Sequence, residues 1–257
     1  MRRGRRILRC TAVLLFWLAV WQLAALRVGT ALLLPEPGAV LRRVAELASS
    51  ADFWAAGGVS LLRISLGSLG GIALGTALAV LTSRFRLLHA LFSPILTIVK
   101  STPVASFIIL ALIWMGRDIL PFFIALLMVL PLVWTNVSAG IASTDRSLLQ
   151  VARVFGFSRC KTLLRVYVPS VMPYFASACR AALGLAWKAG IAAEVLTLPR
   201  RSIGARLYES KLYLETVDLF AWTLVVIICS LAIEKLAMAA LSRVGRRGRK
   251  AAKHDQA

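Results

Sequence analysis

The chain has 257 residues, of which 59% are hydrophobic and only 16% are charged, and its formal net charge is +20. A soluble domain carries about 25% charged residues, so this composition excludes an ordinary soluble protein and indicates an integral membrane protein. The basic residues stand at the ends of apolar runs instead of on one folded face. This placement argues against nucleic acid as a partner and favours contact with anionic membrane lipid.

The first apolar run, residues 10–26, follows a basic cap at residues 1–9. It is long for the apolar core of a signal peptide, which favours a retained transmembrane helix over a cleaved leader. Residues 29–57 are then expected outside the membrane, with a short amphipathic helix at residues 39–48. We therefore take residues 1–56 as an N-terminal unit that consists of one span and an outer segment.

The second predicted span, residues 59–82, contains three glycines at a spacing of four residues: Gly67, Gly71 and Gly75. Residues four apart stack on one face of a helix. Such a small-x-x-x-small face lets another helix approach closely in lipid, so we expect helix packing here. The alternative is that glycine is simply frequent in membrane helices.

Four further spans are expected at residues 88–115, 119–141, 169–196 and 217–241. Residues 57–241 would then form the main transmembrane domain, and residues 242–257 a basic cytoplasmic tail without regular structure. Six spans place both termini in the cytoplasm. Most Lys and Arg residues outside the apolar runs then lie on the cytoplasmic side, as the positive-inside rule requires.

The longest polar interruption, residues 144–169, lies between the fourth and fifth spans and is rich in basic residues. Its first part has the pattern of a short amphipathic helix, which Gly156 is expected to end. A basic loop of this kind stays in the cytoplasm. We expect its helix, exposed below the membrane, to be a docking element for a partner.

The spacing of six residues in this loop resembles the EAA loop of ATP-binding-cassette importer permeases, and these residues are Gln150, Ala152, Gly156, Val166, Val168 and Pro169. Gly156 and Pro169 match the motif outright. Gln150 stands where the family has Glu, and Val151 stands where it has Ala. The stretches SLLRISLGSLGGIALG, KSTPVASFIILALIWMG and GLAWKAGIAAE are similar to permeases of nitrate, sulfonate and taurine uptake systems, so the resemblance covers nearly the whole chain.

The resemblance implies an all-α polytopic fold of the type I importer permeases, with six transmembrane helices and a cytoplasmic coupling helix. In such permeases the coupling helix sits in a cleft of a separate ATPase subunit. The residues that the resemblance assigns to this contact are Leu149, Gln150, Val151, Ala152, Arg153, Gly156 and Pro169.

The resemblance also implies partners and a location. We expect a homodimer in the plasma (inner) membrane and an extracytoplasmic solute-binding protein that sets the choice of substrate. ATP would be used by the ATPase subunit, with no cofactor in this chain. The solute is expected to be small, and an organic or inorganic anion such as sulfonate, taurine or nitrate fits best.

Charged residues also occur within the predicted spans, where each costs at least about 2.5 kcal/mol near the bilayer centre and therefore usually faces protein or water. The candidates for a translocation pathway are Lys100, Ser101, Thr102, Pro103, Lys188 and Glu194. An unpartnered cation there would suit an anion. Pairing of Lys188 with another helix is an equally weighted alternative. Arg63 lies near a span end and is expected to reach the headgroups.

The sequence gives no sign of catalysis. It contains no G-x-x-x-x-G-K-[ST] motif for ATP phosphates, its cysteines lack C-x-x-C spacing, and its two histidines stand far apart. We therefore predict neither an enzyme nor a metal site. Two other functions stay open: a secondary transporter driven by an ion gradient, which acidic residues within spans would favour, and a membrane assembly or sensor protein. Co-purification of a nucleotide-binding subunit would discriminate among the three.

Overall fold

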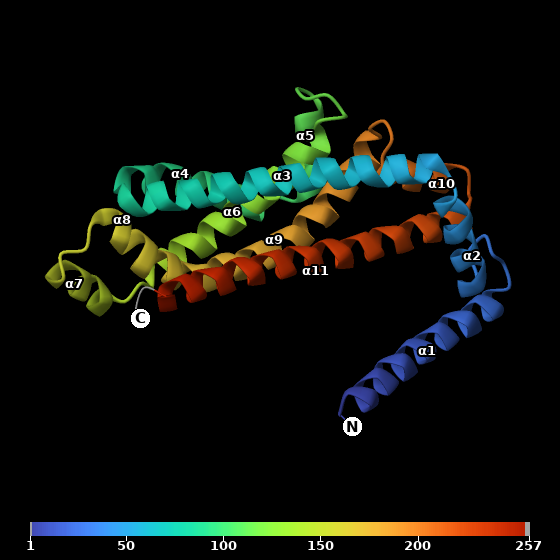
Figure 1. Cartoon of the computed structure of the whole chain (residues 1–257). Helices are drawn as coiled ribbons and strands as arrows, with labels where there is room; N and C mark the ends of the chain where they lie inside the picture. Colours follow the sequence, from blue (N-terminus) through green and yellow to red (C-terminus); the bar gives the residue numbers. More distant parts are fainter. Residues whose placement is uncertain (1, 255–257) are drawn as a thin grey trace.

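The computed structural model describes the backbone of residues 2–254 and the side chains of residue 9 and residues 11–239 (Figure 1). The helices in chain order are α1 (Arg2–Val28), α2 (Pro37–Ala48), α3 (Ala51–Arg84), α4 (Arg86–Ser101), α5 (Val104–Leu112), α6 (Leu120–Ala142), α7 (Arg146–Val154), α8 (Arg159–Thr162), the π-helical η1 (Leu163–Tyr167), α9 (Val168–Thr197), α10 (Ile203–Leu212) and α11 (Thr216–His254). The described backbone contains no β-strand, so the predicted all-α fold class is confirmed.

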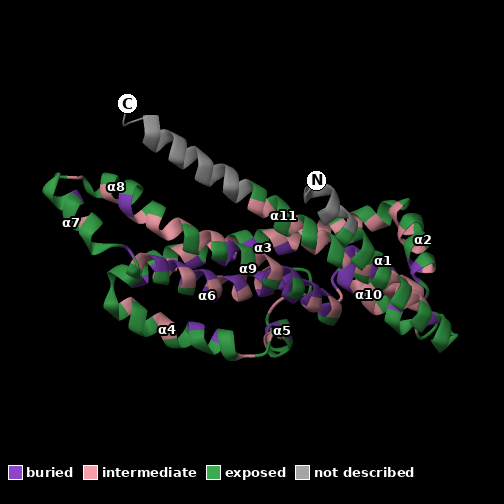
Figure 2. Cartoon of the chain, turned by 90° about the horizontal axis from the view of Figure 1, so that it is seen from below, coloured by how far each residue is buried: buried purple, intermediate pink, exposed green. Residues whose placement is uncertain are grey.

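The core is a packed set of long helices in which α6 lies between α3 and α9, and Figure 2 shows that buried residues concentrate along these helices. Large buried side chains come from α6 and α9, among them Trp134 and Trp187. Small residues recur every three or four positions on the buried side of α9, namely Ala178, Ala182, Ala186, Ala189 and Ala193. Small side chains let the helix backbones approach closely, which is how helices associate in lipid.

The three glycines of α3 all face α6. A Cβ atom added at Gly71 would lie 2.7 Å from the Cβ of Val129, and one at Gly75 would lie 2.7 Å from the carbonyl oxygen of Leu130. At Gly67 an added Cβ would overlap the carbonyl oxygen of Phe122. The three glycines therefore form a surface of α3 that packs against α6, and their presence does not merely reflect the frequency of glycine in membrane helices.

Within the described residues, four helical segments are long and apolar enough to cross a membrane: residues 11–28, α3, α6 and residues 216–239. The fifth predicted span corresponds to α9, which has 30 residues and would be about 45 Å long at 1.5 Å per residue. It is less apolar because it carries Arg180, Lys188 and Glu194. Helices therefore occupy all six predicted ranges, but they are not six equally apolar helices.

The third predicted span, residues 88–115, is wrong as one continuous helix. It is divided into α4 and α5, whose axes differ by 104°. The division falls at Thr102, which is extended with ψ 133°, and at Pro103. A proline disfavours the α conformation at the residue before it and lacks the N–H that a continuous helix needs.

Polar contacts at the other end of the molecule, away from α7, tie the shorter helices to the core. Arg43 of α2 donates two hydrogen bonds to Asp218 of α11, at 2.6 and 2.9 Å. The Asp218 and Glu46 carboxylates raise the pKa of Arg43 above its ordinary value. Arg63 of α3 pairs with Asp118 at 3.1 Å, so it is anchored within the protein as well as lying near a span end.

The two ends of the chain differ from the core. In Figure 1, α1 diverges from the bundle, and Ala25 alone of its described side chains is buried. Trp21 nevertheless anchors it, because the indole Nε1 donates to the carbonyl oxygen of Pro35 at 3.0 Å. The expectation of a tail without regular structure is wrong for residues 242–254, since α11 continues as a helix to His254, and residues 255–257 of the predicted tail lie outside the described residues.

Candidate functional site

The predicted docking helix is α7, which lies at one end of the molecule beyond the end of α6 (Figure 1). Asp145 caps it: its Oδ1 accepts a hydrogen bond from the backbone N–H of Ser147 at 2.8 Å. This bond favours the ionised carboxylate and so lowers the pKa of Asp145. A negative charge at a helix N-terminus also interacts favourably with the helix dipole.

The other end of α7 is closed by a Schellman motif. Gly156 has φ +63°, and its N–H donates to the carbonyl oxygen of Arg153 at 3.0 Å, while the N–H of Phe157 donates to that of Ala152 at 2.8 Å. This pair of bonds requires a left-handed residue at the position of Gly156, which glycine adopts without steric cost. Capping at both ends lets nine residues hold a helix outside the bundle.

Several apolar side chains are exposed on α7 and at its C-terminal end. Val154 and Phe155 are 83% and 72% exposed, and Leu148 and Val151 are also exposed. Ala152, by contrast, is buried. An exposed apolar helix on a polar loop is costly in water unless another surface covers it. Of the other predicted contact residues, Leu149 is half-buried, and Gln150, Arg153 and Pro169 are exposed.

The loop returns to the core through a widened helical turn, η1. The N–H of Val168 bonds to the carbonyl of Leu163, five residues back. The next residue, Pro169, has no N–H to give to an α-helical bond. Val166, one of the motif residues, is the buried member of this turn. Single π-helical turns of this kind are often found at functional positions.

Lys100 lies in the last turn of α4, directly before the break that precedes α5. Its Nζ is 3.1 Å from the Oγ1 of Thr135 on α6, and the lysine side chain is exposed. The hydroxyls of the next two residues turn back onto the helix: Ser101 donates to the carbonyl of Thr97 and Thr102 to that of Ile98, both at 2.8 Å. Pro103 is exposed and precedes α5.

Lys188 and Glu194 of α9 have different surroundings. Lys188 is exposed about two-thirds of the way along α9, on a face that also carries Ser177 and Ala181. Glu194 is fully buried. Its Oε2 accepts hydrogen bonds from Ser60 at 2.8 Å and from the N–H of Gly204 at 3.0 Å, and its Oε1 is buried with no hydrogen-bond partner among the described residues.

Comparison with known proteins identifies the architecture. Residues 71–250 match the model of the family described as binding-protein-dependent transport system inner membrane component. The chain belongs to this family.

Relatives of this permease agree with the assignment. It is 30% identical to a probable ABC transporter permease protein of Brucella melitensis, over 83% of this chain and 87% of the relative. It is 28% identical to a putative aliphatic sulfonates transport permease protein of Bacillus subtilis, over 79% and 74%. A crystallised bacterial alginate ABC transporter has a chain of the same fold, with a TM-score of 0.59, 15% identity and 96% of both chains covered. The predicted family, fold class and non-enzymatic transport role are thereby confirmed.

The predicted site residues of the permease lie at separate places in the fold. The residues from Leu149 to Gly156 lie on α7 and at its C-terminal end, whereas Pro169 lies in the first turn of α9. Lys100 and Lys188 are exposed on membrane helices, whereas Glu194 is buried against Ser60 and α10. Within the described residues, no group of His, Cys, Asp and Glu side chains could hold a metal ion.

The sequence analysis did not predict several features of the candidate sites. The Thr102–Pro103 pair carried a signal for the break between α4 and α5, because a residue before proline avoids the helix. Thr135 and Ser60 could not be recognised from the sequence. Their partners, Lys100 and Glu194, are distant in the chain and come close only when the helices pack. For the π-helical turn η1, the one signal in the sequence was Pro169, which follows it.

Proposed function

We propose that two copies of this permease form the membrane pathway of an importer for a small anion, such as a sulfonate, taurine or nitrate. A separate ATPase subunit drives the change of access by binding α7 on the cytoplasmic side. The observation that carries this proposal is α7 itself: a short helix, capped at both ends, that exposes apolar side chains beyond the end of the bundle.

The orientation follows from charge. Arg84, Arg86 and the basic residues of the α7–α8 loop lie at one end of the bundle, and basic residues stay on the cytoplasmic side. Both termini are then cytoplasmic. The α2 and α10 helices lie at the opposite end (Figure 1) and would meet the solute-binding protein.

Coupling requires that the membrane helices have two arrangements and that contact with the ATPase subunit stabilise one of them relative to the other. In our proposal Leu149, Gln150, Val151, Ala152 and Arg153 form the docking helix. Gly156 fixes its end, and Pro169 lies where the motion enters α9. Gln150 carries no charge, so this contact would rest on apolar packing and hydrogen bonds more than on an ion pair.

The pathway proposal involves Lys100 and Lys188. An exposed lysine on a helix within a membrane is costly unless it faces water or another protein chain, so a water-filled pathway between two copies would account for both. Ser101, Thr102 and Pro103 would shape the wall of that pathway at the break in the helix. A relative named for aliphatic sulfonates transport supports an anionic solute. Glu194 is assigned to helix packing, because it is fully buried against Ser60 and Gly204.

Cross-linking tests the docking of α7. Phe155→Cys, in a chain with the exposed Cys160 replaced by Ser, should form a cross-link to the ATPase subunit in membranes that contain the whole transporter. Leu212→Cys is the matched control, because Leu212 is comparably exposed but lies on α10 at the far end. A cross-link from Leu212→Cys, or none from Phe155→Cys, would count against the proposal.

A further inference from the structure

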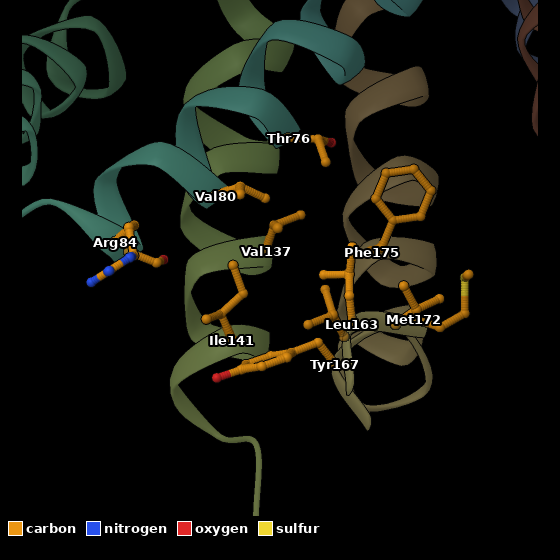
Figure 3. Close-up of a pocket in the computed structure, with 12 residues that line it drawn as sticks. Thr76, Val80, Arg84, Val137, Ile141, Leu163, Tyr167, Met172 and Phe175 are labelled. Carbon is orange, nitrogen blue, oxygen red and sulfur yellow. The ribbon is translucent and has the colours of Figure 1, made fainter. Parts of the chain in front are cut away.

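A cavity of about 470 Å³ lies between the ends of α3 and α6 and the beginning of α9 (Figure 3). Its lining is mostly apolar and includes Val80, Val137, Val171 and Phe175. Several lining side chains, such as Val80, are themselves exposed, so the cavity is a groove on the side of the bundle. Its size is within the roughly 300–1,000 Å³ of pockets that hold small ligands.

The groove is amphipathic along its length. Thr76 and Phe175 lie at the deeper end, where α3 and α9 run within the membrane. Ser83, Arg84 and Tyr167 lie at the end where α3 finishes and η1 begins. Figure 3 shows Arg84 at the rim, with its guanidinium directed away from the apolar gap. A ligand with its apolar chain in the groove and its anionic head outside the rim, on the side where the Arg84 guanidinium lies, therefore matches this arrangement.

The groove does not belong to the candidate pathway. It is lined on α9 by Val168, Val171, Met172 and Phe175. At about 100° per residue in an α-helix, these positions lie about 100–160° around α9 from Lys188. The groove and Lys188 thus lie on different faces of α9.

We propose that this groove binds an anionic phospholipid of the inner leaflet, with one acyl chain along Val80, Val137 and Phe175 and the phosphate at Arg84. The cytoplasmic leaflet supplies anionic lipids, and a basic residue next to an apolar gap between membrane helices is a suitable site for them. Each buried methylene of the chain adds to the affinity, whereas Arg84 selects the head. The inference goes beyond transport, and only the choice of leaflet rests on the orientation proposed above.

The test is to count bound lipids. The purified transporter, transferred from vesicles of equal parts phosphatidylcholine and phosphatidylglycerol, is analysed by native mass spectrometry. We expect Arg84→Gln to lower the retained phosphatidylglycerol severalfold relative to phosphatidylcholine. Val80→Trp, which fills the groove, should lower the retention of both lipids.

Matched controls make the result decisive. Arg86→Gln removes a neighbouring charge outside the groove, and Leu81→Trp enlarges a neighbouring exposed side chain outside it. Both should retain lipid as the unchanged protein does. Equal losses in the Arg84 and Arg86 variants, or undiminished lipid in Val80→Trp, would overturn the proposal. So would a disulfide between two Val80→Cys chains, because a second copy would then cover the groove.

Discussion

At the scale of single residues, Gly156 is the position where backbone geometry and the proposed function meet. Its φ of +63° costs a non-glycine residue about 1–2 kcal/mol, although asparagine tolerates this region better. No neighbouring atom lies within 4 Å of a Cβ added there, so space is not the constraint. Any effect of substitution should therefore follow the backbone preference and not the size of the side chain.

We expect Gly156→Val to abolish uptake, Gly156→Ala to reduce it severalfold and Gly156→Asn to retain most of it, all at unchanged amounts in the membrane. Solute uptake per permease in cells is the measurement. Gly29→Ala is the control, since Gly29 has φ +71° and open space around it but lies outside α7. Normal uptake by Gly156→Val, or an equal loss in Gly29→Ala, would contradict the coupling role.

Lys188 allows a similar test of the pathway. Lys188→Gln should raise the KM for an anionic solute several-fold because it removes an exposed cation, and Lys188→Arg should restore most of the affinity. Lys235→Gln serves as the control, since Lys235 is exposed near the end of the part of α11 that could cross the membrane, residues 216–239. If KM is unchanged in Lys188→Gln, the lysine has a structural role.

The sequence predicted these residues unequally. Gly156 could be recognised because glycine after an amphipathic run is a local signal for a helix end. Lys188 was recognised because charge is rare within an apolar run. The partners of Lys100 and Glu194 could not be recognised, because Thr135 is 35 positions away and Ser60 is 134 positions away. Contacts at such separations depend on how the helices pack.

At the scale of helices, Glu194 joins three elements. Its carboxylate on α9 bonds Ser60 of α3 and the N–H of Gly204 in α10, and the Ser60 hydroxyl accepts from the N–H of Ile203 at 2.9 Å. Gly204 leaves no room for a side chain, because an added Cβ would overlap Glu194. The carboxylate thus holds the start of α10 against the core.

Glu194→Ala should leave buried donors without partners and lower the free energy of unfolding by about 1–3 kcal/mol. Glu194→Gln retains an acceptor oxygen and should cost less. The midpoint of thermal unfolding in detergent measures the difference. Should Glu194→Ala unfold normally and lose uptake of solute, the residue would belong to the pathway instead.

Helix boundaries were predicted well where apolar runs are continuous, as in α6 and α9. The prediction was wrong where a local rule opposes hydropathy. The Thr102–Pro103 pair interrupts an apolar run that looks continuous in composition. The start of α3 was placed too late, because Ser50 caps it by accepting a hydrogen bond from the N–H of Phe53 before the apolar run begins.

At the scale of the whole molecule, the permease exposes several distinct surfaces. One end carries the capped helix α7, the face of α9 around Lys188 is exposed, and another face of α9 lines the groove. The helix α1 adds a further apolar surface, because most of its described side chains are exposed. A chain with so much exposed apolar surface is built for a membrane and for a complex.

The central claim is that this permease moves solute only with energy from an ATPase subunit. The direct measurement is uptake of a radiolabelled sulfonate into proteoliposomes that hold the permease and its solute-binding protein, with and without the ATPase subunit and ATP. We predict uptake only when the ATPase subunit and ATP are both present, and loss of that uptake with Gly156→Val. Uptake by the permease alone, driven by an ion gradient, would contradict the account.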